Sequence, residues 1–151
     1  MITLFREEKL DRHTKAELIV LADDHIAEVG PFQFTFDVDW DKLIYLQEVN
    51  KLVMFTVRCD DNLVGYAIYL IDTHTHFCTT TFAGQDALFI AKEHRGNGNK
   101  FLEFIEDSLL RDGVDAVTQG VLPTHDYSGM LLERGYVASE HIYIKQLRGI
   151  A

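Results

Sequence analysis

The chain has few of the features that mark secreted and membrane proteins. It contains only two cysteines, Cys59 and Cys78, among 151 residues, and this argues against a disulfide and for reduced thiols. No apolar run approaches the roughly 20 residues that cross a bilayer, and the N-terminal sequence MITLFREEKL lacks the pattern of a signal peptide. We therefore expect a cytoplasmic protein that binds no membrane.

Basic residues are also scarce. The sequence has 14 lysines and arginines against 24 aspartates and glutamates, so its formal net charge is −10. Proteins bind nucleic acids through an excess of basic side chains, and we therefore expect no nucleic-acid partner. A negative chain instead favours a cationic substrate such as an amine, because its field steers positive ligands toward it.

Two strings that mark nucleotide-binding proteins do not occur in this sequence. Neither Gly-x-x-x-x-Gly-Lys-(Ser/Thr) nor Gly-x-Gly-x-x-Gly is present, which disfavours a nucleotide-handling protein. A metal centre is disfavoured as well. His74, His76 and Cys78 are spaced two apart and would share one face of an extended chain, but no fourth zinc ligand accompanies them. We therefore expect no metal, and the simplest interpretation is a polar face of a sheet extension. Contact with substrate is a more credible role for the histidines than metal binding.

What is present indicates one α/β domain over residues 1–151, since 47% of the residues are hydrophobic and neither repeat nor linker interrupts the pattern. Thr14 and Glu17 have the spacing of a capping box at the start of the first helix. Asp60-Asp61-Asn62 predicts a hairpin that the polar residues 72–82 could extend. We expect strands at 1–5, 52–59, 63–71, 87–91, 116–121, 136–137 and 141–147, an extended segment at 31–36, and helices at 14–29, 39–49, 99–111 and 126–134.

The stretch from Asp86 to Leu110 carries the strongest functional signal. It reads as a short apolar strand, a turn with the sequence RGNGNK over residues 95–100, and an amphipathic helix. Backbone N–H groups in the first turn of a helix have no partner within that helix, and the helix dipole adds positive potential there. Gly96 and Gly98 allow close approach of the backbone. We therefore expect this turn to bind a phosphate or pyrophosphate.

The element order, the segment EHRGNGNKFLEFIEDSLLRDGVDAV and the segment LLERGYV together resemble the GCN5-related N-acetyltransferase (GNAT) superfamily. The resemblance covers the whole chain in element order and implies a mixed, mostly antiparallel sheet flanked by helices. It implies acetyl-CoA as acyl donor. The turn amides would hold the pyrophosphate of coenzyme A, and the strand would pair with the pantetheine arm. The residues so implied are Phe89, Ile90, Ala91, Arg95, Gly96, Asn97, Gly98, Asn99 and Lys100.

The sequence departs from the family pattern at two positions. Lys100 stands where the signature ends in a small residue, and Leu131 stands where the family often has a general-acid tyrosine. The resemblance suggests Asp86, at the start of the cofactor strand, as the base, although an aspartate facing water at a strand edge fits the pattern equally well. Tyr127 and Tyr136 flank the position of Leu131, and Tyr127 is our candidate acid.

Two classes of function follow from these observations. The first is N-acetyl transfer from acetyl-CoA to a primary amine of a small molecule or protein. The alternative is a catalytically weakened relative that binds acyl-CoA or a protein partner without turnover, which Leu131 favours. Phe32, Phe34, Phe36 and Trp40 would either wall an acceptor cleft or pack in the core. The sheet edges and the C-terminal strand could support a homodimer.

Overall fold

A mixed sheet of five strands, in the order β1-β2-β3-β4-β5, is the centre of the computed structural model, which describes residues 1–29 and 36–149. The first four strands are antiparallel neighbours, and β5 runs parallel to β4. The mostly antiparallel sheet expected from the sequence is thereby confirmed. The strands are β1 (Ile2–Glu7), β2 (Leu52–Cys59), β3 (Asn62–His74), β4 (Phe77–Ile90) and β5 (Ala116–Thr118).

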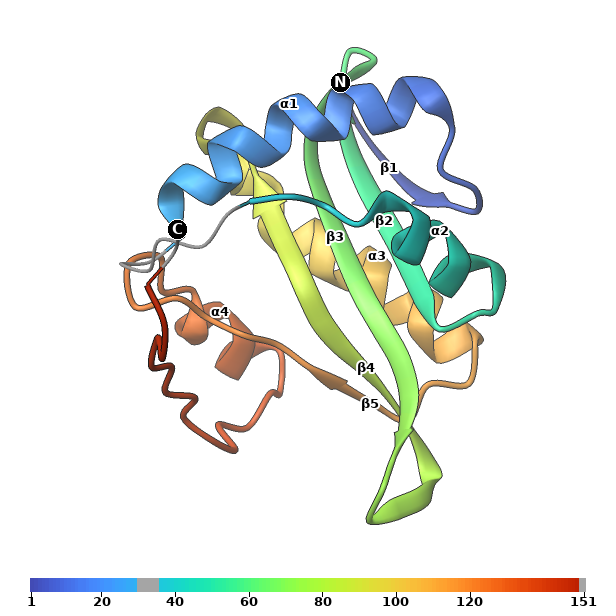
Figure 1. Ribbon diagram of the computed structural model, residues 1–151, viewed down its shortest axis with the longest axis vertical. Coiled ribbons are helices and arrows are strands. Elements are labelled where there is room, and N and C mark those ends of the chain that lie inside the picture. The colour runs from blue at the N-terminus through green and yellow to red at the C-terminus, as the bar shows by residue number, and fades with distance from the viewer. Residues whose placement is uncertain (30–35, 150–151) are drawn as a thin grey trace.

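Helices cover both faces of this sheet (Figure 1). α1 (Arg12–Glu28) and α2 (Trp40–Glu48) lie on one face, and α3 (Gly98–Arg111) lies on the other. A short 3-10 helix, η1 (Lys92–Asn97), leads from β4 into α3, and α4 (Ser128–Glu133) follows β5. No helix in the described part of the chain is long and apolar enough to cross a membrane.

The alternation of side chains along the strands separates two hydrophobic cores. In β2, Leu52 and Met54 face α1 and α2, whereas Val53, Phe55 and Val57 face α3. Because successive side chains of a strand point to opposite faces, one apolar strand supplies both cores. The α3 core is completed by helix residues that are 0 or 1% exposed, namely Phe101, Leu102, Ile105 and Leu109.

The start of α1 differs from the prediction, and the start of α2 agrees with it. Asp11, not Thr14, caps α1: its carboxylate accepts the Thr14 N–H at 2.7 Å. Thr14 is buried inside the helix, and Glu17 pairs with Arg58 at 2.7 Å, so the predicted capping box is wrong. In α2 the Asp39 carboxylate accepts the Lys42 N–H at 3.0 Å, as an N-cap residue does.

The predicted hairpin between β2 and β3 is confirmed. Asp60 and Asp61 have φ values of 47° and 69°, the left-handed pair that a two-residue turn between antiparallel strands requires. The polar stretch 72–82 does extend the next hairpin, of β3 and β4. However, His76 lies in the turn of that hairpin, and His74 and Cys78 lie on different strands. The expectation that these three side chains share one strand face is therefore wrong.

The C-terminal part of the chain is the largest departure from the predicted elements. The described residues after α4 form no strand, although 136–137 and 141–147 were expected to pair. The side chains of Ile142 and Tyr143 are 84 and 91% exposed, so their alternating pattern has no sheet partner to cover it. β5 is also shorter than expected because the chain leaves the sheet after Thr118. The extended segment expected at 31–36, with Phe32 and Phe34, lies almost entirely outside the described residues, as does Gly30.

Substitution of Gly65 tests how closely β3 and β4 approach each other. A Cβ atom at this residue would lie 2.9 Å from the Phe89 carbonyl oxygen, so we expect Gly65→Ala to lower the free energy of unfolding by about 1–3 kcal/mol. Urea denaturation measures the change. Gly129→Ala, in α4 with nothing within 4 Å of the added atom, is the matched control and should raise stability slightly. Equal effects of the two substitutions would contradict the packing argument.

Candidate functional site

The site begins where β4 and β5 separate. β5 pairs with β4 only from Phe82↔Ala116 to Gly84↔Thr118 within the described residues, while β3 accompanies β4 as far as Ile90. The chain after β5 turns away from the sheet, and the Gly120 N–H donates instead to the Gln85 side chain at 2.8 Å. One edge of residues 85–90 is therefore left without a neighbouring strand.

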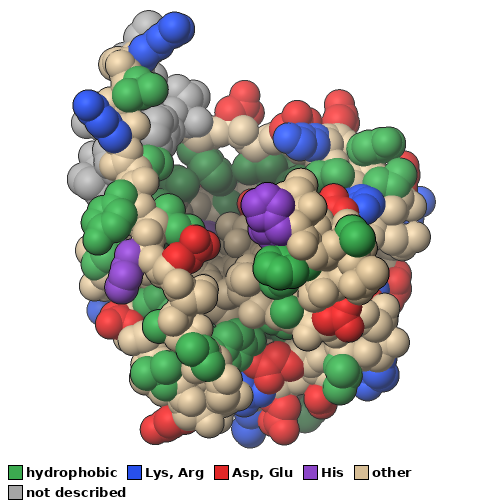
Figure 2. All heavy atoms as spheres, turned by 90° about the horizontal axis from the view of Figure 1, so that it is seen from below, with side chains coloured by type: hydrophobic (Ala, Val, Ile, Leu, Met, Phe, Trp, Pro, Cys, Tyr) green, Lys and Arg blue, Asp and Glu red, His purple; other side chains and the backbone are tan. Residues whose placement is uncertain are grey.

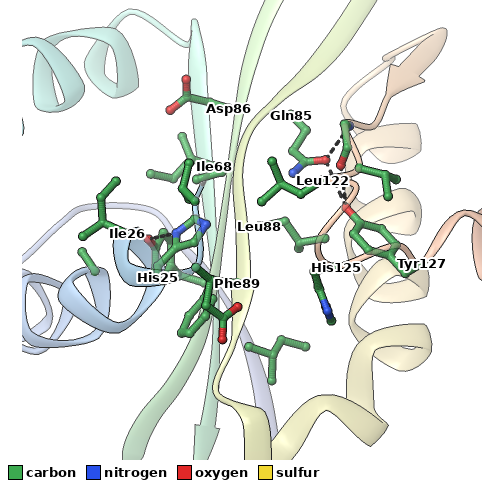
Figure 3. Close-up of a pocket in the computed structure, with 18 of the residues that line it drawn as sticks. His25, Ile26, Ile68, Gln85, Asp86, Leu88, Phe89, Leu122, His125 and Tyr127 are labelled. Carbon is green, nitrogen blue, oxygen red and sulfur yellow. Dashed lines mark hydrogen bonds between the residues drawn. The ribbon is translucent and has the colours of Figure 1, made fainter. Parts of the chain in front are cut away.

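A β-bulge lies at the same point. Tyr69 is opposite Gln85 and Ile68 is opposite Ala87, so Asp86 is an additional residue in β4. The bulge changes which face each later side chain occupies: Phe89 packs with the α1 and α2 core, and Ile90 packs with the α3 core. Figure 3 shows Asp86 and Phe89 on one side of β4, and Gln85 and Leu88 on the other. Asp86 is exposed to solvent.

A cavity of about 1270 Å³ follows this part of β4. It extends from the apolar residues of α1 and α2, past Asp86 and Phe89, to Gly98 and Phe101 at the start of α3. The loop after β5 forms the opposite wall through residues 120–125. Figure 2 shows the molecule hollowed on one face, with hydrophobic side chains around the hollow. A cavity of this size can hold a ligand larger than a typical drug molecule.

The glycine turn that the sequence singled out lies at one end of this cavity. Of the turn residues 95–100, Arg95 and Gly98 line the cavity, and at Gly96 an added Cβ would meet nothing within 4 Å, so the space beside that residue is open. The side chains of Asn97 and Asn99 are bonded within the protein: the Asn97 side-chain amide donates to the His94 carbonyl at 2.9 Å, and the Asn99 side-chain oxygen accepts from Arg134, which follows α4, at 2.7 Å. Lys100 is exposed in the first turn of α3.

Arg95 connects this turn to two other elements. Its Nε donates to the Ile90 carbonyl at 3.0 Å, and its Nη2 contacts both carboxylate oxygens of Glu28, at 2.6 and 2.7 Å. Its guanidinium also lies over the Phe89 ring, 5.7 Å from the centroid. A contact of Arg95 with a phosphate would therefore compete with the end of α1.

The backbone of β4 is only partly available to a ligand. The Ala91 N–H donates to the Val64 carbonyl at 2.7 Å, so this amide already belongs to the β3 side. Because consecutive residues of an antiparallel strand direct their backbone groups to opposite edges, Ile90 and, two residues earlier, Leu88 face the open edge. Of the three residues expected to pair with the pantetheine arm, only Ile90 directs its backbone groups to the open edge, while Phe89 and Ala91 direct theirs to β3.

Tyr127 lies across the cavity from β4, where Figure 3 shows its hydroxyl near Gln85. The hydroxyl donates to the Gly120 carbonyl at 2.9 Å, and the Gln85 side-chain oxygen is 3.4 Å away. Burial raises the pKa of Tyr127 to about 12, so the phenol keeps its proton near neutral pH. Asp86, on the other side of β4, lines the same cavity.

The other positions near α4 serve the core. Leu131 is buried against α3, so the position of the family's usual tyrosine carries no polar group. Tyr136 donates to Glu106 at 2.9 Å and is close to Gln119, and Tyr69 donates to Gln119 at 3.1 Å. Tyr136 does not line the cavity. Of the two tyrosines considered from the sequence, Tyr127 is the one in the site.

His25 and Tyr66 are site residues that the sequence analysis missed. His25, from α1, lies in the cavity with its Nδ1 2.5 Å from the Tyr66 hydroxyl oxygen, and its ring stacks on Phe89 at 4.8 Å between centroids. Burial lowers the pKa of His25 and raises that of Tyr66 to about 12, so both groups are neutral near pH 7. The only sequence signal was a histidine within the apolar stripe of a helix.

The histidine-rich hairpin is separate from this site. His74 and His76 contact each other at the tip of the β3–β4 hairpin, with ring centroids 5.3 Å apart, and do not line the cavity. Figure 1 shows this hairpin extending beyond the helices. No cluster of three or more possible metal-ligating side chains occurs among residues 1–29 and 36–149.

Comparison with known proteins gives matches in structure only. No family model matches the sequence, and no curated protein matches it. A ribosomal-protein-alanine N-acetyltransferase from Brucella melitensis biovar Abortus 2308 superimposes with a TM-score of 0.75 at 14% identity, over 99% of each chain. An aminoglycoside acetyltransferase from an uncultured soil metagenomic sample gives 0.70 at 16% identity, over 99% of this chain and 97% of that one.

A predicted acetyltransferase from Clostridium acetobutylicum, solved with acetyl-CoA, gives a TM-score of 0.67 at 12% identity over 97% of each chain. The chain has the GNAT fold. Within the GNAT fold, the named acceptors of similar proteins include an aminoglycoside and a ribosomal-protein alanine, so the common scaffold does not define one acceptor.

The buried His25 makes a testable contribution to the pH dependence of stability. Burial lowers the pKa of His25 in the folded chain, so on acidification the unfolded chain binds this proton at a higher pH than the folded chain does. The stability due to the neutral imidazole is present above about pH 6.5 and is lost as the pH falls through the lowered folded value. We expect His25→Gln to lose less stability than the wild type between pH 7.5 and 5, as measured by urea denaturation. His141→Gln, at an exposed position, should behave as the wild type; a wild-type slope in His25→Gln would refute the assignment.

Proposed function

We propose that the protein is an N-acetyltransferase that moves an acetyl group from acetyl-CoA directly to a primary amine of a small molecule or protein. The observation that carries the proposal is the open edge of β4 running into the glycine turn at the start of α3, along one cavity. This arrangement provides backbone groups for an extended amide-containing chain and a helix N-terminus for its anionic end. A CoA ester has both parts.

Donor binding would use the two segments in sequence. The amides of the turn from Arg95 to Lys100 would hold the pyrophosphate, and the dipole of α3 would add positive potential. Leu88 and Ile90 would pair with the pantetheine amides, which leaves the thioester near the bulge at Asp86. A backbone N–H in this region would polarise the thioester carbonyl as negative charge develops on its oxygen.

Acetyl transfer from an ammonium acceptor requires two protons to leave the nitrogen, one before attack and one as the amide forms, and one proton to reach the leaving thiolate. We infer that Asp86 accepts the proton of the ammonium, directly or through a water molecule. The neutral amine then attacks the thioester carbon, a C–N bond forms, and the C–S bond breaks. Tyr127 would give its proton to the thiolate, because its hydroxyl is protonated and lines the same cavity. The second proton that the nitrogen loses as the amide forms would then restore the phenol.

A second candidate function is binding of acyl-CoA without turnover. The burial of Leu131 favours it, because the usual acid position is apolar. Asp86 and Tyr127 in one cavity favour catalysis. Release of free thiol in the presence of amines separates the two functions, since a binder would give a ligand response without thiol.

Thermal denaturation tests the donor site. Acetyl-CoA and CoA should raise the melting temperature, and ATP should not, because ligands that bind only the folded state stabilise it. Gly98→Val should abolish this response by placing a branched side chain at the cavity end. Gly129→Val, in α4 and outside the cavity lining, is the matched control and should retain the response. The proposal fails if neither CoA species shifts the wild-type transition.

Substitution of the two proton-transfer candidates tests the chemistry. We expect Asp86→Asn and Tyr127→Phe each to lower kcat by about 100-fold or more while the thermal response to acetyl-CoA remains. Thiol release with an excess of amine measures kcat. Asp24→Asn, an exposed aspartate of α1 outside the cavity lining, should be unaffected. Wild-type turnover in Asp86→Asn would remove Asp86 as the base without affecting the donor assignment.

A further inference from the structure

We call the part of the cavity next to α1 and α2 its acceptor half; most of the side chains that line it are apolar. Its walls come from α1, α2, the two central strands and the loop after β5, and include Ile26, Val38, Trp40, Leu43, Ile68 and Leu122. Some of these side chains are partly exposed in the protein without a ligand; Ile26, for example, is 40% exposed and Leu122 is 36% exposed. An apolar surface of this kind favours a ligand whose body is also apolar.

Charged side chains are few in this cavity. Among its described lining residues only Glu28, Asp86 and Arg95 carry a formal charge near neutral pH, and His25 and His125 are the titratable imidazoles. Glu28 and Arg95 neutralise each other through their ion pair, with Nη2 and Oε1 2.6 Å apart. Asp86 is thus the one carboxylate of the described lining that has no ion-pair partner.

Aromatic side chains line the cavity on the side of β4 that carries Asp86. The rings of His25 and Phe89 stack at an interplanar angle of 18°, and Tyr66 meets His25 edge-on at 5.6 Å. All three line the cavity, on the same side of β4 as Asp86, where Figure 3 shows His25, Ile26 and Ile68 grouped beneath that carboxylate. A flat or branched apolar body would pack here with its ammonium group directed toward Asp86.

We propose that the acceptor is a small primary amine with a single positive charge and an apolar, preferably aromatic, body. The proposal rests on the acetyltransferase function given above and names the substrate class of that site. A polycationic acceptor would place several ammonium groups against apolar walls whose described residues offer one free carboxylate. A sugar phosphate would meet no free cation among the described lining residues, because Arg95 is held by Glu28. The acceptor nitrogen replaces sulfur on the acetyl carbon, and free CoA thiol and one proton are released.

A panel of amines tests this substrate class. Thiol release is measured with 2-phenylethylamine, ethanolamine, kanamycin and glucosamine 6-phosphate. We expect kcat/KM for 2-phenylethylamine to exceed that for each of the other amines by about 100-fold or more. Only this amine combines a single positive charge with an apolar body that can pack against the cavity walls. Comparable or better turnover of kanamycin or glucosamine 6-phosphate would overturn the proposal.

Two variants of α1 sharpen the test. Ile26→Ser lowers the apolar character of the cavity wall and should reduce kcat/KM for 2-phenylethylamine by about tenfold, with little change for ethanolamine. Ile19→Ser is the matched control: it is an isoleucine of the same helix, 45% exposed against 40% for Ile26, and it does not line the cavity. Equal losses in the two variants would contradict a specific contact.

The thermal response to acetyl-CoA distinguishes a wrong substrate class from failure of the proposed acetyltransferase function. If acetyl-CoA stabilises the protein but 2-phenylethylamine is not acetylated preferentially, the substrate class is wrong and the donor assignment stands. If acetyl-CoA gives no stabilisation, the proposed function fails and the acceptor proposal fails with it. Stabilisation by acetyl-CoA together with preferential turnover of 2-phenylethylamine supports both.

Discussion

The separation of β4 from β5 is the feature on which the rest of the site depends. A β4 that was paired on both edges along its whole length would have no backbone groups to offer a ligand. Pairing stops at Gly84, and the bulge at Asp86 follows immediately. The same short stretch therefore opens an edge for a ligand and changes the face that the side chains after Asp86 occupy.

The two halves of the cavity are connected through Arg95. This side chain bonds to the end of β4 and to the end of α1, so the glycine turn and the wall of the acceptor region are held by one guanidinium. An arginine that the sequence placed in the expected phosphate-binding turn thus has a structural role that only the folded chain reveals. Its flat guanidinium suits this position, because it can bind a carboxylate through two hydrogen bonds while covering the Phe89 ring.

The sequence predicted those parts of the fold that depend on neighbouring residues. The Asp60-Asp61 turn, the Asp39 cap and the glycine turn before α3 are each determined within a few residues. Errors arose where distant contacts decide: Glu17, expected in the capping box, pairs with Arg58 41 positions away, and residues 141–147 have no strand partner among the described residues. His25 was not identifiable because Tyr66, which is 41 positions away in sequence, brings it into the site.

The charge of the chain and the character of the cavity act at different distances. A net charge of −10 attracts any cation from solution, and it attracts polycations most strongly. Selection among the cations that arrive must come from contact, where apolar walls penalise every ammonium group that Asp86 cannot neutralise. The acidic surface and the apolar cavity are therefore complementary: the surface would speed the arrival of amines, and the cavity would retain those with one charge and an apolar body.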